Sequence, residues 1–107
     1  NHNELNLDTY QYDRGDLTVA ANIVAKFEEN FGKARKAFES FDEAKAADPW
    51  TLVKGGHTII PPTPKIEIIR YVLYNHVYHH RGQLTTYLRA TGNTVPGLYG
   101  ITADGHR

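Results

Sequence analysis

The sequence predicts an all-α fold, an antiparallel up-and-down four-helix bundle to which this chain supplies two long helices and a small β-hairpin connector. Two long stretches repeat apolar residues every three or four positions, as amphipathic helices do. Each apolar face needs a covering surface, and a pair of helices leaves about half of each face in water. Further helices are therefore expected, from a second copy of the chain or from residues upstream of Asn1.

The first helix is expected to begin at Asp16 and to end between residues 42 and 48. Asp16 is the expected N-cap, and Pro49 disfavours helical geometry in the residue before it. The segment before Asp16 has no periodicity and is interpreted as a loop. Apolar positions spaced by three and four define the helix: Leu17, Ala20, Val24, Phe27, Phe31, Ala34, Phe38 and Phe41.

A short β-hairpin is expected between the helices. Two β-prone runs, residues 51–54 and 57–60, flank a Gly-Gly pair, which is a hairpin signal. The prolines at positions 61, 62 and 64 are expected to stop strand pairing beyond it. Because so small a hairpin is not stable alone, it is expected to rest on Trp50 and the helices as a connector.

The second helix is expected from Thr63, as N-cap, to about Thr91. Gly92 is the expected left-handed residue that closes it, and residues 93–107 are expected to form an irregular tail. One face of this helix carries Ile66, Ile69, Leu73, His76, Val77, His80, Leu84, Tyr87 and Leu88. The opposite side is marked by Glu67, Arg70, Tyr74, Arg81, Thr85 and Arg89.

Composition excludes several functional classes. Twelve Lys and Arg balance 12 Asp and Glu, which leaves no summed positive field for nucleic acid or anionic lipid. No apolar stretch approaches the roughly 18 residues of a membrane span, and the N-terminus lacks the features of a signal peptide. We therefore expect a cytoplasmic protein that binds neither nucleic acid nor membrane.

Two residue types are missing from the chain, Cys and Met. Without Cys there is no zinc ribbon and no thiolate nucleophile, so thiol chemistry would require a small thiol co-substrate. Without Met at position 1, we expect residues 1–107 to be a single domain that forms the C-terminal part of a longer four-helix-bundle domain.

Histidine is the one enriched functional residue, with three of six copies between His76 and His80. Residues four apart lie about 40° apart on a helix, so His76 and His80 share one face and can hold one metal ion together. Both occupy positions of the apolar face, where neutral ring nitrogens are donors to a divalent cation. Spacing alone leaves open that the pair consists of core histidines bonded to neighbours.

Three flanking residues are candidates for supporting the metal ligands without contacting the metal themselves. His79 lies to one side of the pair and is expected at the surface or as support to a ligand. Arg81 is ordinarily a solvated charge, whereas Gln83 lies close enough to the apolar face to orient an imidazole. The other histidines, His2, His57 and His106, are expected to have no role at the site.

Two histidines do not complete a catalytic metal site. Three protein ligands and an open position are the usual arrangement. The first helix offers no inward His or carboxylate, so the third ligand is expected upstream of Asn1.

The run from Asn75 to Leu84, Asn-His-Val-Tyr-His-His-Arg-Gly-Gln-Leu, resembles a motif in the C-terminal half of the DinB/YfiT-like family of metalloenzymes. Other pieces agree in order on both sides of this motif. They are Glu4–Leu7, the helix from Asp16, Asp42-Glu43, Pro49–Leu52, Gly55-Gly56, Tyr87–Arg89, Gly92, Val95-Pro96, Tyr99-Gly100 and Ala103-Asp104.

The resemblance implies an antiparallel four-helix bundle, often a homodimer, that holds a divalent ion with three histidines. Two of these carry over onto His76 and His80, and the third belongs to an earlier helix that has no counterpart here. Some members activate a small thiol for transfer, and others are described as hydrolases.

Residues and resemblance together predict a divalent-metal-binding protein that activates water or a small thiol, of hydrolase or thiol S-transferase type. Imidazole ligands suit Zn, Ni, Fe or Mn. The alternatives are a non-catalytic helical bundle and a stress-related binding protein with core histidines.

Overall fold

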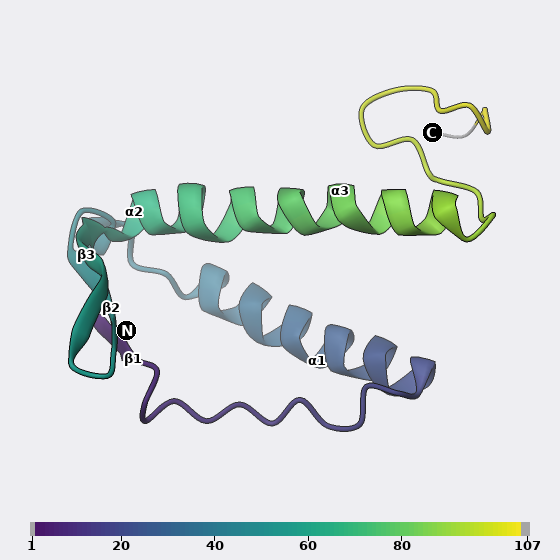
Figure 1. Cartoon of the computed structure of the whole chain (residues 1–107). Helices are drawn as coiled ribbons and strands as arrows, with labels where there is room; N and C mark the ends of the chain where they lie inside the picture. The colour runs from purple at the N-terminus through teal and green to yellow at the C-terminus, as the bar shows by residue number, and fades with distance from the viewer. Residues whose placement is uncertain (1, 106–107) are drawn as a thin grey trace. The chain divides into compact units, whose positions relative to one another are not determined.

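The computed structural model describes residues 2–105. The chain forms two compact units, which meet in sequence between Ile66 and Glu67. Figure 1 shows the order of the elements along the chain. A short strand, a long helix and two further strands are followed by a second long helical stretch and an irregular tail. The elements are β1 (Glu4–Asn6), α1 (Ala20–Glu39), η1 (Glu43–Lys45), β2 (Pro49–Lys54), β3 (His57–Pro64), α2 (Lys65–Glu67), η2 (Ile68–Tyr74) and α3 (Asn75–Ala90).

The prediction of an all-α four-helix bundle is wrong. The described residues form two long helical stretches and a three-stranded mixed sheet. The hairpin is therefore part of a sheet and more than a connector. The sequence before Asp16 holds a third strand that the prediction did not include, and the apolar faces of both long helices remain exposed among the described residues.

The strand β1 lies in the segment interpreted as a loop, and that interpretation is wrong for residues 4–6. It pairs parallel to β2, with Leu5 opposite Leu52. Backbone hydrogen bonds continue the pairing beyond the strand, from Thr51 N to Asn3 O and from Leu7 N to Val53 O, each 3.0 Å. Three residues are too few for an alternating pattern, so their strand conformation comes from the neighbour and not from local sequence.

The predicted hairpin turn is confirmed. β2 and β3 are antiparallel, with Lys54 opposite His57. Gly55 and Gly56 have φ angles of +57° and +74°, and two left-handed residues in succession favour glycine in a two-residue hairpin turn. The carboxylate of Asp8 adds a contact by accepting a 2.7 Å hydrogen bond from Gly55 N.

The predicted end of strand pairing at the prolines is wrong. β3 continues to Pro64, and Thr63 lies opposite Trp50. The sheet order β1-β2-β3 makes β3 an edge strand, where a residue without an N–H is tolerated. The register also shifts between Trp50 and Leu52, which accommodates the irregular backbone.

The first predicted helix is present as α1, but both of its predicted ends are wrong. It begins at Ala20, and it ends at Glu39 and not between residues 42 and 48, where Asp42 instead caps the short helix η1. The N-cap of α1 is Val19, and the carboxylate of Asp16 instead accepts hydrogen bonds from Thr18 N and Thr18 Oγ1 at 2.9 and 2.6 Å. These two bonds, the side-chain bond above all, lower the pKa of Asp16. Asp16 therefore closes the turn before the helix and is not its cap.

The second predicted helix is present as the continuous stretch α2, η2 and α3. It begins at Lys65 because Thr63 and Pro64 belong to β3. The middle segment η2 is a π-helix, in which Asn75 N donates to the carbonyl of Arg70, five residues earlier. Because a π-helix has more residues per turn than an α-helix, the faces computed at 100° per residue do not run straight from residue 66 to residue 80.

The predicted end of this helix at Gly92 is confirmed. Gly92 has a φ of +79°. Its N–H donates to Arg89 O at 3.1 Å, and Asn93 N donates to Leu88 O at 2.9 Å. This pair of hydrogen bonds is the Schellman arrangement, which satisfies two carbonyls of the last turn.

The tail after α3 is ordered by one cluster of contacts. Among the described residues, Val95 is the one hydrophobic residue that is buried, with 7% of its surface exposed. Its N–H donates to Asp104 Oδ2 at 2.9 Å and its carbonyl accepts from Thr102 Oγ1 at 3.1 Å. Arg89 binds both carboxylate oxygens of Asp104, Nη1 to Oδ1 and Nη2 to Oδ2, each at 2.9 Å. The tail is therefore fastened to α3.

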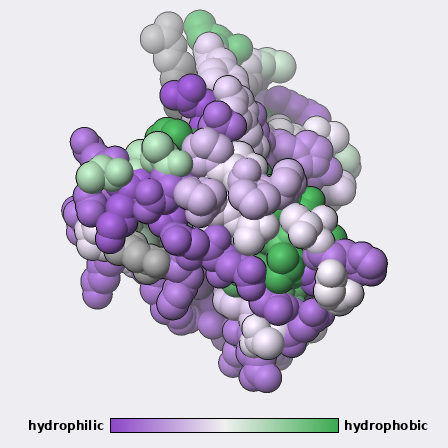
Figure 2. Space-filling view, turned by 90° about the vertical axis from the view of Figure 1, so that its left-hand side faces the viewer, coloured by the Kyte–Doolittle hydropathy of each residue, from purple (hydrophilic) through white to green (hydrophobic). Residues whose placement is uncertain are grey.

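Large apolar side chains are exposed along both long helices, and Figure 2 shows hydrophobic residues at the surface among hydrophilic ones. On α1 the exposed set includes Val24, Phe27, Phe31 and Phe38, with Phe27 63% exposed. No helix within residues 2–105 has both the length and the apolar character needed to cross a membrane.

Candidate metal centre

The predicted histidine pair lies on α3. His76 and His80 are one turn apart, and their ring centroids are separated by 4.6 Å. The two Nε2 atoms are 2.8 Å apart, so both rings turn the same nitrogen toward one point. Both residues are exposed in this chain, together with the apolar side chains beside them.

Gln83 supports one ring of the pair. Nδ1 of His80 donates to Oε1 of Gln83 at 2.8 Å. In the neutral ring this proton on Nδ1 leaves a lone pair on Nε2. Metal-binding histidines almost always use their second nitrogen in this way. The structure contains the hydrogen bond between Gln83 and an imidazole, and its role at a metal site stays a prediction.

His79 lies beside the pair, with its ring 5.1 Å from that of His80 in an edge-to-face arrangement. It is not a third ligand in this geometry. Among the residues described, no group of three His, Asp or Glu side chains is arranged to hold a metal ion.

Arg81 does not occupy the side of the helix predicted for it. It lines an open groove with both histidines, whose remaining walls are apolar and whose volume is about 470 Å³. Arg81 follows Val77 by four residues, so the two residues lie about 40° apart on α3 and share a face. The lining residues are Val72, Leu73, His76, Val77, His80, Arg81 and Leu84.

The guanidinium of Arg81 contacts two tyrosines. It lies over the rings of Tyr78 and Tyr99, at 5.0 and 5.1 Å from their centroids, and its Nη2 donates to the hydroxyl of Tyr99. The sequence analysis did not predict the contact with Tyr99, which is 18 residues from Arg81 and belongs to the irregular tail. No spacing rule connects two such positions.

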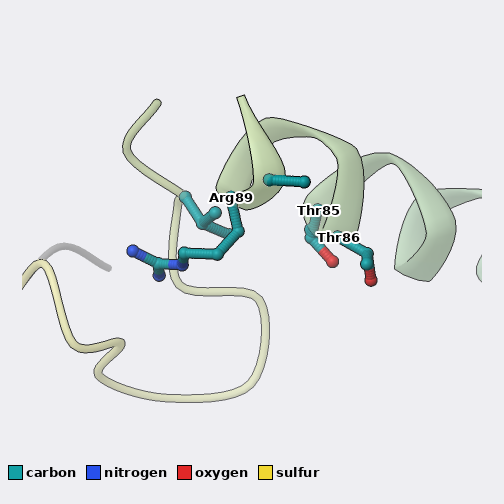
Figure 3. A pocket seen from close by; sticks show the side chains of 5 residues that line it. Thr85, Thr86 and Arg89 are labelled. Atoms are coloured by element: carbon teal, nitrogen blue, oxygen red, sulfur yellow. The ribbon is translucent and has the colours of Figure 1, made fainter. Parts of the chain in front are cut away.

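A second pocket lies where α3 meets the tail. Figure 3 shows Arg89 extending away from Thr85 and Thr86. Ala90 and Val95 complete the lining of the pocket. The polar groups here already have partners within the chain. Both threonine hydroxyls donate to Gly82 O, at 2.7 and 3.2 Å, and Arg89 is bound to Asp104. This pocket is therefore a feature of tail packing.

The histidines set aside from the sequence lie elsewhere. His57 is the first residue of β3 and is exposed, as is His2 near the N-terminus. His106 lies outside the described residues. Neither His57 nor His2 belongs to a group of metal-binding side chains in the described part of the chain.

The donor atoms present fit a first-row divalent cation in part. Two nitrogens bound to one ion at about 2.0–2.1 Å are roughly 2.9–3.4 Å apart for bond angles between 90° and 109°. The observed separation of 2.8 Å is close to this range, so a small outward movement of the rings admits an ion. The two imidazole nitrogens are the groups that such an ion would meet here, and the amide of Gln83 supports one of the rings.

These features define a chain of mixed α and β structure whose candidate site is a pair of histidines in an HxxxH motif on the last long helix. The family model of the DinB family matches residues 8–105, and the chain belongs to this family. Comparisons with curated proteins and with solved structures gave no match.

Proposed function

We propose that this member of the DinB family binds a divalent metal ion through Nε2 of His76 and Nε2 of His80. The observation that carries the proposal is their separation of 2.8 Å on neighbouring turns of one helix. Zn, Ni, Fe and Mn all accept imidazole ligands, so the donor set does not select among them.

Two further features support a binding role. Gln83 holds the proton on Nδ1 of His80, which leaves Nε2 free to coordinate. The π-helical segment η2 ends at Tyr74, immediately before the helix that carries the pair. Because π-helical turns are frequent at functional sites, this segment is consistent with a site at His76.

The proposed activity is that of a hydrolase or a thiol S-transferase. A bound divalent ion lowers the pKa of a coordinated water or thiol and so supplies a nucleophile near neutral pH. In this proposal His76 and His80 hold the ion, and Val77 and Leu84 form the apolar walls of the groove beside it. A third protein ligand has to come from outside residues 2–105 or from a second copy of the chain.

We also propose that the chain functions as a homodimer. A folded chain rarely leaves many large apolar side chains in water, and Phe27 and Phe31 on α1 are 63% and 56% exposed. Light scattering coupled to size-exclusion chromatography should give twice the chain mass. A monomeric mass at micromolar concentration would reject this part of the proposal.

The experiment that tests metal binding compares the metal content of three purified proteins. Wild type should carry metal, and the double variant His76→Ala, His80→Ala should carry almost none. His79→Ala is the matched control, because it removes a neighbouring imidazole on the same helix that lies outside the Nε2 pair. Equal metal content in wild type and the double variant would reject the assignment of these ligands.

One observation favours a second candidate, a non-catalytic protein. The Nε2–Nε2 distance is also that of a hydrogen bond, so His76 and His80 can satisfy each other without metal. Under this alternative, chelator treatment of wild type should leave the thermal unfolding temperature and the binding of small thiols unchanged.

A further inference from the structure

Arg81 is a fixed cation in the same groove as the histidine pair. It is the one lining residue of the groove with a permanent charge. The ion pairs of the described residues engage two arginines, Arg35 and Arg89, and give Arg81 no carboxylate. Since neutral imidazoles contribute no negative charge, the groove as a whole is electropositive.

The surroundings of the guanidinium restrict how it can bind. The rings of Tyr78 and Tyr99 lie within about 5 Å of it, and the hydroxyl of Tyr99 accepts one N–H of Nη2. Nε of Arg81 is buried and has no hydrogen-bond partner. Because a guanidinium carries five N–H donors in one plane, donors remain at its edge, where a carboxylate binds.

These contacts also restrict the position of the charge. An arginine that already contacts two rings loses little further side-chain entropy when an anion arrives. Tyr99 is therefore a positioning residue, and the tail that carries it is held on α3 by Arg89 and Asp104.

We propose that Arg81 makes the groove selective for small ligands that carry a carboxylate. The proposal rests on the proposed metal-binding function and names its substrate class: the carboxylate binds the edge of the Arg81 guanidinium, and the reacting thiol or carbonyl faces His76 and His80. A small thiol co-substrate should accordingly be an anionic one.

The test measures the affinity of full-length, metal-loaded protein for two thiols of similar size, mercaptoacetate and neutral 2-mercaptoethanol, by calorimetry. Wild type should prefer mercaptoacetate by about tenfold or more, as expected for one charge-assisted hydrogen bond. Arg81→Gln should reduce this preference to about twofold or less. Arg70→Gln, which removes an exposed arginine of η2 outside the groove, should retain it.

A second measurement separates this proposal from metal binding. In metal-free protein, acetate should shift the NMR signal of Arg81 Nε–H in wild type and in the His76→Ala, His80→Ala variant alike. Arg81→Lys serves if Arg81→Gln does not fold, since it keeps the charge but loses the planar fork and should weaken the acetate response. A wild-type protein that binds no metal but still responds to acetate would overturn the metal proposal alone. The absence of any thiol preference in wild type, or its persistence in Arg81→Gln, would overturn the carboxylate site.

Discussion

Nδ1 of His80 donates a hydrogen bond of 2.8 Å to Oε1 of Gln83, three residues further along α3. This contact determines which ring nitrogen of His80 is available, because a proton held on Nδ1 leaves the lone pair on Nε2. Nε2 is the atom that faces His76. Gln83, the last residue of the run Arg-Gly-Gln, thus influences which nitrogen of His80 faces His76.

Replacing Gln83 by leucine should weaken metal binding by about 10- to 100-fold, as is typical when the partner of a ligating histidine is removed. The variant removes the acceptor of the His80 proton and leaves an apolar side chain one atom shorter. Competition with a chromophoric chelator measures the change. Gln83→Glu retains an acceptor and should bind metal at least as tightly as wild type. A Gln83→Leu protein with wild-type affinity would show that the contact has no influence on the pair.

The elements that sequence reasoning predicted correctly are those set by local chemistry. The spacing of three and four placed the two helices, and Gly55-Gly56 and Gly92 marked a turn and a helix end because only left-handed residues fit there. The contact between His76 and His80 follows from helical geometry alone.

The features that were missed depend on residues far apart in the chain. β1 becomes a strand only beside β2, more than forty residues later, and Pro61 is tolerated in β3 only because that strand lies at the sheet edge. The place of Arg81 in the groove depends on Tyr99 in the tail. The fold class was therefore wrong even though most helix positions were correct.

Replacing Asp104 by alanine should release the tail from α3. The substitution removes both contacts to Arg89 and leaves Val95 N without its acceptor, which is unfavourable for a partly buried group. It also removes the hydrogen bond that raises the pKa of Arg89. We expect faster amide exchange at Val95 and earlier proteolytic cleavage within residues 93–105.

The control for this prediction is Glu39→Ala, which breaks an exposed ion pair with Arg35 on α1 and should leave tail exchange unchanged. Equal protection of Val95 in wild type and in Asp104→Ala would contradict the assignment of Asp104 as the tail anchor.

The stability of α1 should depend on pH through Glu29. Hydrogen bonds from Lys33 and from Lys26 lower the pKa of Glu29 from 4.5 to about 2. A group whose pKa is lower in the folded state stabilises that state above its unfolded pKa, and this stabilisation is lost as the pH falls from 4.5 toward 2. Because the side chain is exposed, the effect should be small and should weaken with salt.

The measurement for Glu29 is helical circular dichroism during thermal unfolding of wild type and Glu29→Gln at several pH values. Wild type should be the more stable protein at pH 7, and the difference should disappear near pH 2. A difference that stays constant over this range would exclude ionisation of Glu29 as its cause.

Alanine substitutions at two glycines, one inside α3 and one just after its end, should change the stability of the protein in opposite directions. Gly92 has a φ of +79°, so Gly92→Ala should destabilise the protein by about 1–2 kcal/mol because a Cβ is disfavoured in the left-handed region. Gly82 lies inside α3, and a Cβ added there meets no atom within 4 Å. Gly82→Ala should therefore stabilise by roughly 0.5–1 kcal/mol, since alanine loses less backbone entropy in a helix. Urea unfolding at one fixed protein concentration measures both, because association would otherwise shift the midpoints. If Gly82→Ala is destabilising, its face of α3 is in close contact with a partner surface, and the substitution then identifies that face as an interface.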